Sequence, residues 1–480
     1  MDQSPPPSPL RLNGRRVHFV GIGGTGMSGL ARIVAQRGGV CSGSDHQANP
    51  SIDALREAGI TVQLEQRAES VPEACDLMVI SAAIHRDHPE VIEANRRGIP
   101  VLKYARMLGQ LMLGHTGIAV AGTHGKSSTT SMLAHVLIQC GLDPSVIVGA
   151  HCAQIGGGSR SGEGELLVAE ACEYDRSFHH LHPRDAIILN VEPDHLDLYS
   201  GLDEIVEAFA AFAALLPRDG LLLIQHECAP RLDITGHLQC RVQTLGFAPQ
   251  SDWRIELHTD DEGRGLTRLH YGGGHVAAWT SPLPGEHMAY NAAAAAVMAH
   301  RHGAAWKDIT RAIEDFKGLD RRMQRLGQCR IGSRSERPVV VVDDYGHHPT
   351  EVETTLRALR QFWKPERVIC IFQPHQHSRT RFLMDQFAAS FSAADVVIVP
   401  RIYFVRDSEQ ERQAVTAGDL VDRLRKRGAM AMHLYPFDAI VEQLQVVARP
   451  GDLIVTMGAG DVWKVAHAYL HAAGGTFDDA

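Results

Sequence analysis

The chain has 480 residues, 44% of them apolar and 21% charged, which is typical of a soluble globular protein with about two to four domains. Its formal net charge of −9 offers no electrostatic footprint for nucleic acid or for an anionic membrane. No apolar run approaches the roughly 18 residues that a membrane-spanning helix needs, so we expect neither a nucleic-acid partner nor a membrane partner.

The N-terminus is polar and rich in Pro, and residues 1–14 are predicted to form a short disordered tail and not a signal peptide. The nine Cys are scattered without a C-x-x-C pair, which favours free thiols in a reducing cytoplasm. Runs of His at 179–182, 346–348 and 375–377 are expected to be surface or substrate-contacting residues and not a dedicated metal site.

The first part of the chain alternates strand-like and helical patterns. Residues 17–20 predict a buried strand, followed by a Gly-rich turn and a helix that continues to about residue 34. Another strand-like step ends at CSGSD, with Asp45, and a further buried strand is predicted at 75–84. Residues 99–112 predict a strand that leads into a helix. Alternating strands and helices indicate βαβ units and a parallel sheet.

The same pattern restarts twice. The further predicted strands are 116–123, 165–171, 185–191, 220–225, 367–375, 394–400 and 452–460, and the segment 337–362 is predicted as a strand, a loop and then a helix. The predicted helices among them are 202–216, 291–303 and the segment that ends at 362, and residues 250–275 predict a hairpin.

We therefore expect three α/β domains: a Rossmann-like domain over residues 15–112, a P-loop ATPase with a mostly parallel sheet over 113–327, and a second Rossmann-like domain over 328–480.

The first Gly-rich turn has the form Gly21-x-Gly23-x-x-Gly26 between a strand and a helix. Such glycines let the backbone approach a pyrophosphate at the positive end of the helix. Asp45 follows 24 residues after Gly21, near where a ribose-binding acid is expected. The motif favours a nucleotide or dinucleotide over an empty turn, but it does not distinguish NAD from a nucleotide sugar.

A second Gly-rich turn joins the strand at 116–123 to a helix. Val120 stands where a standard P-loop has its first Gly, and Gly122 replaces that Gly in a tighter loop. In the Gly125-Lys126-Ser127 segment, backbone N–H groups can hold phosphate, Lys126 adds positive charge and the Ser127 hydroxyl can bind Mg²⁺. The sequence therefore predicts an ATP site.

Further polar residues follow the ends of other predicted strands. Glu170 and His195 each follow a predicted strand, and ligands of parallel sheets bind beyond the carboxyl ends of strands. We expect both to converge with Lys126 and Ser127 on one ATP–magnesium site. Residues 343–351 and 373–381 lie at further strand ends, where His347 and Arg379 suit a carboxylate; the alternative is that both stretches are ordinary polar surface loops.

Over about residues 15–465 the chain resembles the Mur amino-acid ligases of peptidoglycan synthesis, because six stretches occur in the order and spacing of that family. They are HFVGIGGTGMSGLA, AGTHGKSSTT, EACEYDRSF, NVEPDHLD, DDYGHHPTEV and SRTR. The resemblance implies a UDP-sugar domain, a central ATPase and an amino-acid domain. It also implies formation of an amide between L-alanine and the lactyl carboxylate of UDP-N-acetylmuramate, through an acyl phosphate, with ATP and two Mg²⁺ ions, in a cytoplasmic monomer or homodimer.

The resemblance also implies roles for individual residues. Catalysis would rest on Lys126, Glu170, His195 and Arg322, and Mg²⁺ would be held by Ser127, Glu170 and His195. The implied ATP-contacting residues are Gly122, Thr123, His124, Gly125, Lys126, Ser127, Ser128, His287, Asn291, Arg322 and Asp344. The implied substrate-contacting residues are Gly21, Gly23, Gly24, Thr25, Gly26, Met27, Ser44, Asp45, His124, Glu173, Tyr345, His347 and Arg379.

The chain departs from the family pattern at a few positions. Met288 stands where an Asn is usual, Gln376 stands where many relatives have Arg, and EACEYD replaces the commoner E-A-D-E-S-D. We expect Arg379 to hold the alanine carboxylate, with His347 or His377 sharing it in place of the missing Arg.

Three other functions are compatible with parts of the sequence. One is a sister ligase that adds a preformed tripeptide to the same UDP-sugar in wall recycling. Another is an NAD-dependent oxidoreductase, which leaves the second loop, Glu170 and His195 unexplained. The third is a nucleotide-binding scaffold without catalytic activity.

Overall fold

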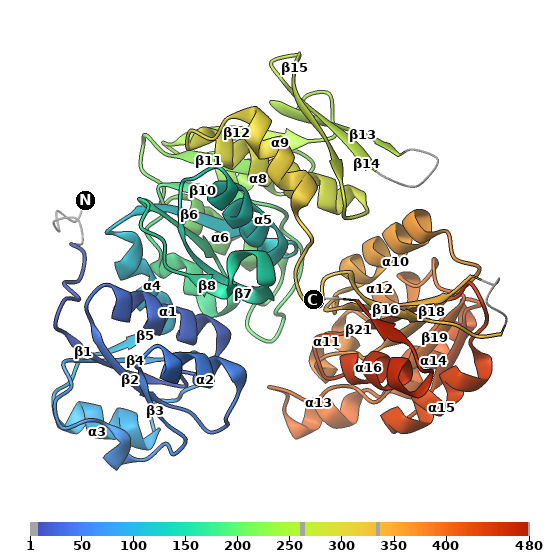
Figure 1. Ribbon diagram of the computed structural model, residues 1–480, viewed down its shortest axis with the longest axis horizontal. Helices are drawn as coiled ribbons and strands as arrows, with labels where there is room; N and C mark the ends of the chain where they lie inside the picture. The colour runs from blue at the N-terminus through green and yellow to red at the C-terminus, as the bar shows by residue number, and fades with distance from the viewer. Residues whose placement is uncertain (1–7, 260–264, 333–336, 479–480) are drawn as a thin grey trace.

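The computed structural model describes residues 8–259, 265–332 and 337–478, and these residues form three lobes, each built on its own sheet (Figure 1). Helices cover the sheets, and the strands within each sheet are mostly parallel. The prediction of three α/β domains is therefore confirmed. In the described part of the chain, no helix is long and apolar enough to cross a membrane.

The N-terminal sheet is fully parallel, with strand order β3-β2-β1-β4-β5. Its strands are β1 (Arg16–Val20), β2 (Val40–Ser44), β3 (Thr61–Gln63), β4 (Leu77–Ile80) and β5 (Val101–Lys103). Its helices are α1 (Thr25–Gln36), α2 (Pro50–Glu57), α3 (Pro89–Arg96) and α4 (Tyr104–Met112), with a 3₁₀ turn η1 (Ala68–Ser70). The first Gly-rich turn therefore connects β1 to the N-terminus of α1.

The predicted disordered tail is wrong for its last residues. Leu12 is only 8% exposed and packs in the core of this domain. The N–H of Gly14 donates a hydrogen bond to the carbonyl of Gly38 at 2.8 Å. The chain before β1 therefore buries apolar surface and pairs its backbone, while residues 1–7 lie outside the described residues.

The central sheet has ten strands in the order β15-β14-β13-β12-β11-β10-β6-β9-β7-β8. The strands are β6 (Thr116–Ala121), β7 (Ser145–Cys152), β8 (Gly157–Arg160), β9 (Leu166–Glu170), β10 (Asp185–Ile188), β11 (Leu221–Gln225), β12 (Arg241–Gly246), β13 (Trp253–Thr259), β14 (Gly265–Tyr271) and β15 (Gly274–Ser281). The pairs β13–β14, β14–β15 and β7–β8 are antiparallel. The predicted hairpin at 250–275 is thus part of a three-stranded meander at one edge.

The helices of the central domain pack on both faces of this sheet. They are α5 (Lys126–Gln139), α6 (Leu202–Ala213), α7 (Arg231–Thr235), α8 (Glu286–Arg301) and α9 (Trp306–Asp315), with 3₁₀ turns η2 (Ala153–Ile155) and η3 (Tyr174–His180). Every residue of α8 from Met288 to Ala299 is buried, and its run of Ala lets this helix lie close against α5.

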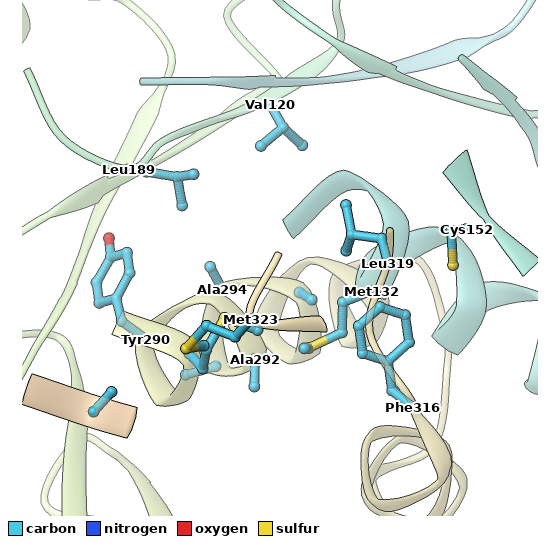
Figure 2. Packing of buried hydrophobic residues seen from close by; sticks show 14 of the residues in the cluster. Val120, Met132, Cys152, Leu189, Tyr290, Ala292, Ala294, Phe316, Leu319 and Met323 are labelled. Carbon is cyan, nitrogen blue, oxygen red and sulfur yellow. The ribbon is translucent and has the colours of Figure 1, made fainter. Parts of the chain in front are cut away.

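Val120, which stands where a standard P-loop has its first Gly, lies in β6 and not in the turn (Figure 2). The Val120 side chain points from β6 toward the core that holds Met132, Leu189 and Tyr290, and it is fully buried. Position 120 therefore belongs to the strand and contributes an apolar side chain to the core. The turn itself begins at Gly122, whose φ of +140° favours Gly.

The C-terminal sheet has strand order β20-β19-β18-β21-β17-β16-β22, with β16 and β22 antiparallel to their neighbours. Its strands are β16 (Gln324–Cys329), β17 (Val339–Asp344), β18 (Val368–Phe372), β19 (Val396–Val399), β20 (Met430–His433), β21 (Leu453–Met457) and β22 (Thr476–Phe477). Its helices are α10 (Pro349–Trp363), α11 (His377–Phe382), α12 (Met384–Ala389), α13 (Glu409–Ala414), α14 (Ala417–Lys426), α15 (Phe437–Val447) and α16 (Trp463–Ala472). The predicted boundary after residue 327 falls inside β16, which pairs with β17, so strand pairing places Gln324 onward in the third sheet.

Candidate active site

The second Gly-rich turn is held by the end of the neighbouring strand β10. The N–H of Thr123 donates to the carbonyl of Asn190 at 3.0 Å, and the N–H of His124 donates to Asn190 Oδ1 at 2.7 Å. Gly125 has φ +83°, and a Cβ there would lie 2.9 Å from Asn291 Oδ1. Because α5 begins at the next residue, the turn presents the positive end of a helix to any bound anion.

Lys126 folds back over this turn. Its ammonium donates to the carbonyl of Gly122 at 2.6 Å and to that of Thr123 at 3.1 Å, and it lies 2.9 Å from Glu173 Oε2. Burial alone would lower the pKa of Lys126, but the carboxylate of Glu173 outweighs it and raises that pKa. The pKa of Glu173 is lowered in turn, because the charges of Lys126 and His195 outweigh burial. The loop therefore holds a fixed positive charge.

Ser127 and Glu170 lie in direct contact, as the sequence predicts. The Ser127 hydroxyl donates to Glu170 Oε2 at 2.9 Å, and the N–H of Gly149 donates to the same oxygen at 2.9 Å. A hydroxyl beside a carboxylate is a hard oxygen ligand set, which suits Mg²⁺. The residues present therefore fit the predicted ion.

His195 lies in the same cavity but contacts different carboxylates. Its Nε2 lies 3.5 Å from Glu173 Oε1 and 3.8 Å from Asp194 Oδ2. His195 lies in the loop after β10, and its backbone φ of +52° is unusual for a residue other than Gly. The structure thus brings Lys126, Ser127, Glu170 and His195 together around one cavity of about 480 Å³.

Two adjoining cavities share one wall. The cavity of about 480 Å³ is also lined by Thr123, Glu173, Tyr345 and His347. The second cavity, of about 420 Å³, is lined by most of the residues expected to contact ATP: His124, Gly125, Ser128, His287, Asn291, Arg322 and Asp344. His124, Gly125, Arg322 and Glu351 line both cavities. These four residues therefore lie between ligands bound in the two cavities.

Glu351 is a site residue that the sequence reasoning missed. It projects from α10 of the C-terminal domain and lies 3.3 Å from His124 Nδ1 and 3.6 Å from Arg322 Nη1. It also accepts hydrogen bonds from the N–H groups of His347 and His348, which form the start of α10. The sequence does contain a signal for Glu351, because it stands three residues after the N-cap His348, where a capping box places a Glu at the start of a helix.

His124 is a cation between two carboxylates. Burial alone would lower its pKa, but Glu192 and Glu351 raise it to about 9. Its Nε2 lies 3.5 Å from Glu192 Oε2, which belongs to the central domain, whereas Glu351 belongs to the C-terminal domain. His124 therefore adds a second positive charge to the turn and joins the two domains.

Arg322 and Asp344 border the nucleotide cavity from the C-terminal side. The Arg322 guanidinium lies over the Tyr345 ring at 4.9 Å, and Asp344 accepts hydrogen bonds from the N–H groups of Met323 and Gly346 at 2.7 Å each. Burial raises the pKa of Asp344 to about 6. Burial likewise lowers the pKa of His287 to about 4, so this imidazole is neutral at pH 7.

The residues expected around the amino acid separate into two groups. Tyr345 and His347 line the cavity of about 480 Å³, but burial lowers the pKa of His347 to about 3, so it carries no charge at pH 7. His377 is directed to Asp407 at 3.3 Å and does not line that cavity. His347 is therefore neutral and His377 faces Asp407, so the structure gives no support to the expectation that one of them shares the alanine carboxylate.

The other expected residue, Arg379, is buried and paired with Asp194 at 2.8 Å. Both residues line a small adjoining hollow that also contains His195 and Gln376. The Nε2 of Gln376 is buried without a hydrogen-bond partner among the described residues. Met288, another departure from the family pattern, accepts a long hydrogen bond on sulfur from Asn291 Nδ2 at 3.7 Å.

The first Gly-rich turn lies at the junction of the N-terminal and central domains. The N–H of Gly23 donates to Asp45 Oδ2 at 2.8 Å, while Gly24 and Thr25 are exposed. A Cβ at Gly26 would lie 2.7 Å from the Tyr104 hydroxyl. The helix α1 that follows packs against β7 and β8 of the central domain.

Two residues expected at this turn direct their side chains elsewhere. Met27 is 4% exposed and packs in the core, and the Ser44 hydroxyl donates to the buried Glu90 at 2.6 Å. Neither side chain is free to contact a ligand, so the expectation is corrected to their backbone groups alone.

Comparison with known proteins agrees with this architecture. The catalytic domain of the Mur ligase family matches residues 16–116, the Mur ligase middle domain matches 120–299, and the glutamate ligase domain of Mur ligases matches 321–460. The UDP-N-acetylmuramate–L-alanine ligase of Caldanaerobacter subterraneus subsp. tengcongensis is 39% identical over 95% of this chain and 97% of its own length. That of Geobacter sp. strain M21 is 38% identical over the same shares.

The solved structures lead to the same family. The UDP-N-acetylmuramate–alanine ligase of Thermotoga maritima superposes with a TM-score of 0.76 at 25% identity and covers 95% of this chain and 98% of its own. A murein peptide ligase from Psychrobacter arcticus gives a TM-score of 0.66 at 25% identity, with coverage of 96% and 99%. With three family domains in order and relatives that match along nearly the whole chain, the protein belongs to the Mur ligase family.

Proposed function

We propose that this protein is an ATP-dependent ligase that joins L-alanine to the lactyl carboxylate of UDP-N-acetylmuramate in peptidoglycan precursor synthesis. The observation that carries the proposal is the pair of adjoining cavities with a shared wall of His124, Gly125, Arg322 and Glu351. The proposed substrates are taken from the names of the relatives, which are L-alanine ligases 35–39% identical over at least 95% of this chain. The enzyme acts in the cytoplasm as a monomer or homodimer.

ATP occupies the cavity of about 420 Å³, with its phosphates toward the Gly125 turn. The lactyl carboxylate enters the neighbouring cavity and attacks the γ-phosphorus, which forms an acyl phosphate and releases ADP. Lys126, His124 and the backbone N–H groups of the turn stabilise the phosphate charge during this transfer. Mg²⁺ ions held by Ser127 and Glu170, and by His195, supply further charge neutralisation when bound.

The neutral amine of alanine then attacks the acyl carbon, phosphate leaves with the electrons of the broken C–O bond, and the proton lost by the amine passes to the departing phosphate or to water. Tyr345 and the neutral His347 line the space for alanine. Phosphate leaves far more readily than the oxide of a free carboxylate would, so the energy of ATP is used to activate the carboxylate. Catalysis depends mainly on holding the two reactants in line between the cavities.

The UDP part of the sugar nucleotide is assigned to the first Gly-rich turn. Gly24 and Thr25 are exposed there, and α1 offers its positive end to a pyrophosphate. The turn faces the central domain through α1 and β8. The sugar end of the substrate can therefore reach toward the cavity that contains Lys126.

Two other activities are less well supported. A tripeptide ligase has the same architecture, and the solved murein peptide ligase and the solved alanine ligase are both 25% identical to this chain. The alanine ligase superposes better, with a TM-score of 0.76 against 0.66, and the curated relatives at 35–39% identity are named as L-alanine ligases. An NAD-dependent oxidoreductase would leave the P-loop cavity and its charged residues without a role.

Phosphate release tests the proposal. Purified protein is incubated with ATP, Mg²⁺, UDP-N-acetylmuramate and L-alanine, and each component is omitted in turn. We expect turnover only when all four are present, and L-alanine to be preferred over glycine and L-serine. Full turnover without the UDP-sugar, or faster turnover with an alanyl tripeptide than with alanine, contradicts the proposal.

A further inference from the structure

Two imidazoles and one carboxylate meet where the central and C-terminal domains touch. His124 comes from the P-loop, Glu192 from the loop after β10, and His348 from the N-cap of α10. One ligand atom from each lies within 4.8 Å of the other two. His124 Nε2 is 3.5 Å and His348 Nδ1 is 4.0 Å from the same oxygen, Glu192 Oε2.

Outer partners orient both rings toward this point. His348 Nε2 lies 3.2 Å from the carbonyl of Pro193, and because a carbonyl only accepts, the ring carries its proton there and leaves a lone pair on Nδ1. His124 Nδ1 lies 3.3 Å from Glu351 Oε1, and its Nε2 is buried without a hydrogen-bond partner among the described residues. A metal-binding His almost always donates its other nitrogen to a carbonyl or carboxylate in this way.

The competing contacts at the three ligand atoms are few. The Nδ1 of His348 accepts only a long hydrogen bond of 3.3 Å from the N–H of Thr350, and Glu192 Oε2 accepts one of 2.6 Å from the Thr350 hydroxyl. The rings of His124 and His348 lie 4.6 Å apart, tilted by 43°. Binding of a cation replaces the proton that His124 holds in the metal-free protein, so one proton is released.

We propose that His124, Glu192 and His348 bind a divalent cation of the Zn²⁺ class, at a position separate from the Mg²⁺ ligands of the reaction. Imidazole nitrogen suits Zn²⁺, Cu²⁺ or Ni²⁺, whereas Mg²⁺ prefers oxygen. Bonds of about 2.0–2.1 Å in a tetrahedron place ligand atoms about 3.3–3.4 Å apart. The observed separations therefore close with side-chain shifts of about 1 Å, and three protein ligands leave a fourth position open.

The proposed ion has a consequence for the reaction. It takes two ligands from the central domain and one from the C-terminal domain, so it links the two domains where they touch. His124 also lines both cavities. If the proposed function holds, we therefore expect bound Zn²⁺ to slow the ligase, because the ion takes a side chain that borders both cavities.

The test measures Zn²⁺ binding directly, by calorimetry on the full-length protein with Mg²⁺ in large excess to occupy the oxygen sites. We expect one Zn²⁺ to bind per chain with an affinity that His348→Gln and Glu192→Gln each weaken at least about tenfold. His300→Gln is the matched control, since this imidazole lies on α8, bonds the Ala304 carbonyl and packs against Trp306.

Substitution with Co²⁺ gives an independent reading, because a His-ligated Co²⁺ absorbs visible light and the band should disappear in His348→Gln. If His348→Gln fails to fold, Glu192→Gln decides the matter alone. The proposal is overturned if wild-type protein binds no Zn²⁺ under excess Mg²⁺, or if both variants bind it as tightly as wild type. No turnover is measured, so the outcome is independent of the ligase activity.

Discussion

The guanidinium of Arg379 donates hydrogen bonds from Nε and Nη2 to one oxygen of Asp194, at 3.0 and 2.8 Å. Arg379 is 6% exposed and comes from α11 of the C-terminal domain, whereas Asp194 comes from the loop after β10. The remaining nitrogen, Nη1, lies 3.4 Å from His375 Nδ1. The residue expected to hold alanine thus also joins two domains, and a substrate carboxylate would have to be bound by the N–H groups of Nη1 and Nη2 that do not face Asp194.

Replacing Arg379 by Ala should therefore have two effects. The KM for alanine should rise roughly 10- to 150-fold, because a charge-assisted hydrogen bond contributes about 1.5–3 kcal/mol. The free energy of unfolding should fall by about 3–5 kcal/mol, because Asp194 is left as a buried unpaired charge. Steady-state kinetics with alanine varied, and thermal denaturation, measure the two effects separately.

Arg381→Ala is the control for this experiment, since Arg381 is exposed on the same helix and pairs with Glu411. It should change the KM for alanine by less than about twofold, as is usual for a surface ion pair. Gln376→Ala should also have a smaller effect than Arg379→Ala, because Gln376 is neutral. An unchanged alanine KM in Arg379→Ala removes this residue from the amino-acid site.

The oxygen ligands near the P-loop allow a second prediction. Glu170→Ala should lower kcat by roughly 10²-fold or more, because the charge that develops on the phosphates loses its stabilisation. Binding of UDP-N-acetylmuramate, measured by calorimetry, should stay within about twofold, since it is assigned to the other turn. Glu165→Ala, at an exposed position just before the same strand, is the control. Near-native kcat in Glu170→Ala at saturating Mg²⁺ would exclude this carboxylate from the metal site.

The cavity of about 420 Å³, which we assign to ATP, is lined by Asn291 and by Met288, the residue that stands where the family usually has Asn. Asn291→Ala should raise the KM for ATP about tenfold or more, because it removes a buried amide beside Gly125. Met288→Leu should change it by less than about threefold, since the 3.7 Å contact of its sulfur with Asn291 is a weak hydrogen bond. The KM for alanine serves as the internal reference and should not change. A larger effect from Met288→Leu than from Asn291→Ala would show that the sulfur itself contacts the nucleotide.

The raised pKa of His124 predicts how stability depends on pH. Its pKa of about 9 in the folded protein lies above the unfolded value near 6.5, so the folded state binds a proton more tightly. Its contribution to stability is fully present below pH 6.5 and is lost as the pH rises to about 9. Thermal denaturation without ligands should therefore show a difference between wild type and His124→Gln that is largest near pH 6.

That difference should shrink toward pH 9, by about 2–4 °C in Tm for each kcal/mol of lost stabilisation. His226→Gln is a suitable control, because it replaces a His of the same domain at the end of β11 without the two carboxylates. A constant Tm difference from pH 6 to pH 9 would show that His124 is not held in its charged form.

Local patterns in the sequence predicted most of the architecture. The alternation of apolar strands with helices predicted three α/β units, because parallel strands are buried on both faces and read as continuous apolar runs. The two Gly-rich turns were located correctly, since the positive φ of Gly21 in the first turn and of Gly122 and Gly125 in the second favours a residue without a Cβ. The strands β12, β16 and β20 were missed, because polar residues interrupt or end their apolar residues and they lack such a run.

The residues of the candidate site were predicted as separate stretches, and the structure decided how they pair. That Ser127 contacts Glu170, while His195 contacts Glu173, depends on which neighbouring strands end side by side. The pairing of Arg379 with Asp194, and of His124 with Glu351, crosses from one domain to another over long stretches of chain.

The sequence by itself determined the chemistry available to this protein: a phosphate-binding turn, a lysine, hard oxygen ligands and several imidazoles. Only the tertiary structure decided the charge state of those imidazoles. His124 and His347 are both only partly exposed where the central and C-terminal domains touch. His124 lies between two carboxylates, which raise its pKa and hold it charged, while desolvation outweighs the nearby Glu351, lowers the pKa of His347 and keeps it neutral. The pKa of a buried group depends on which charges the fold places around it, and the order of residues along the chain does not contain that information.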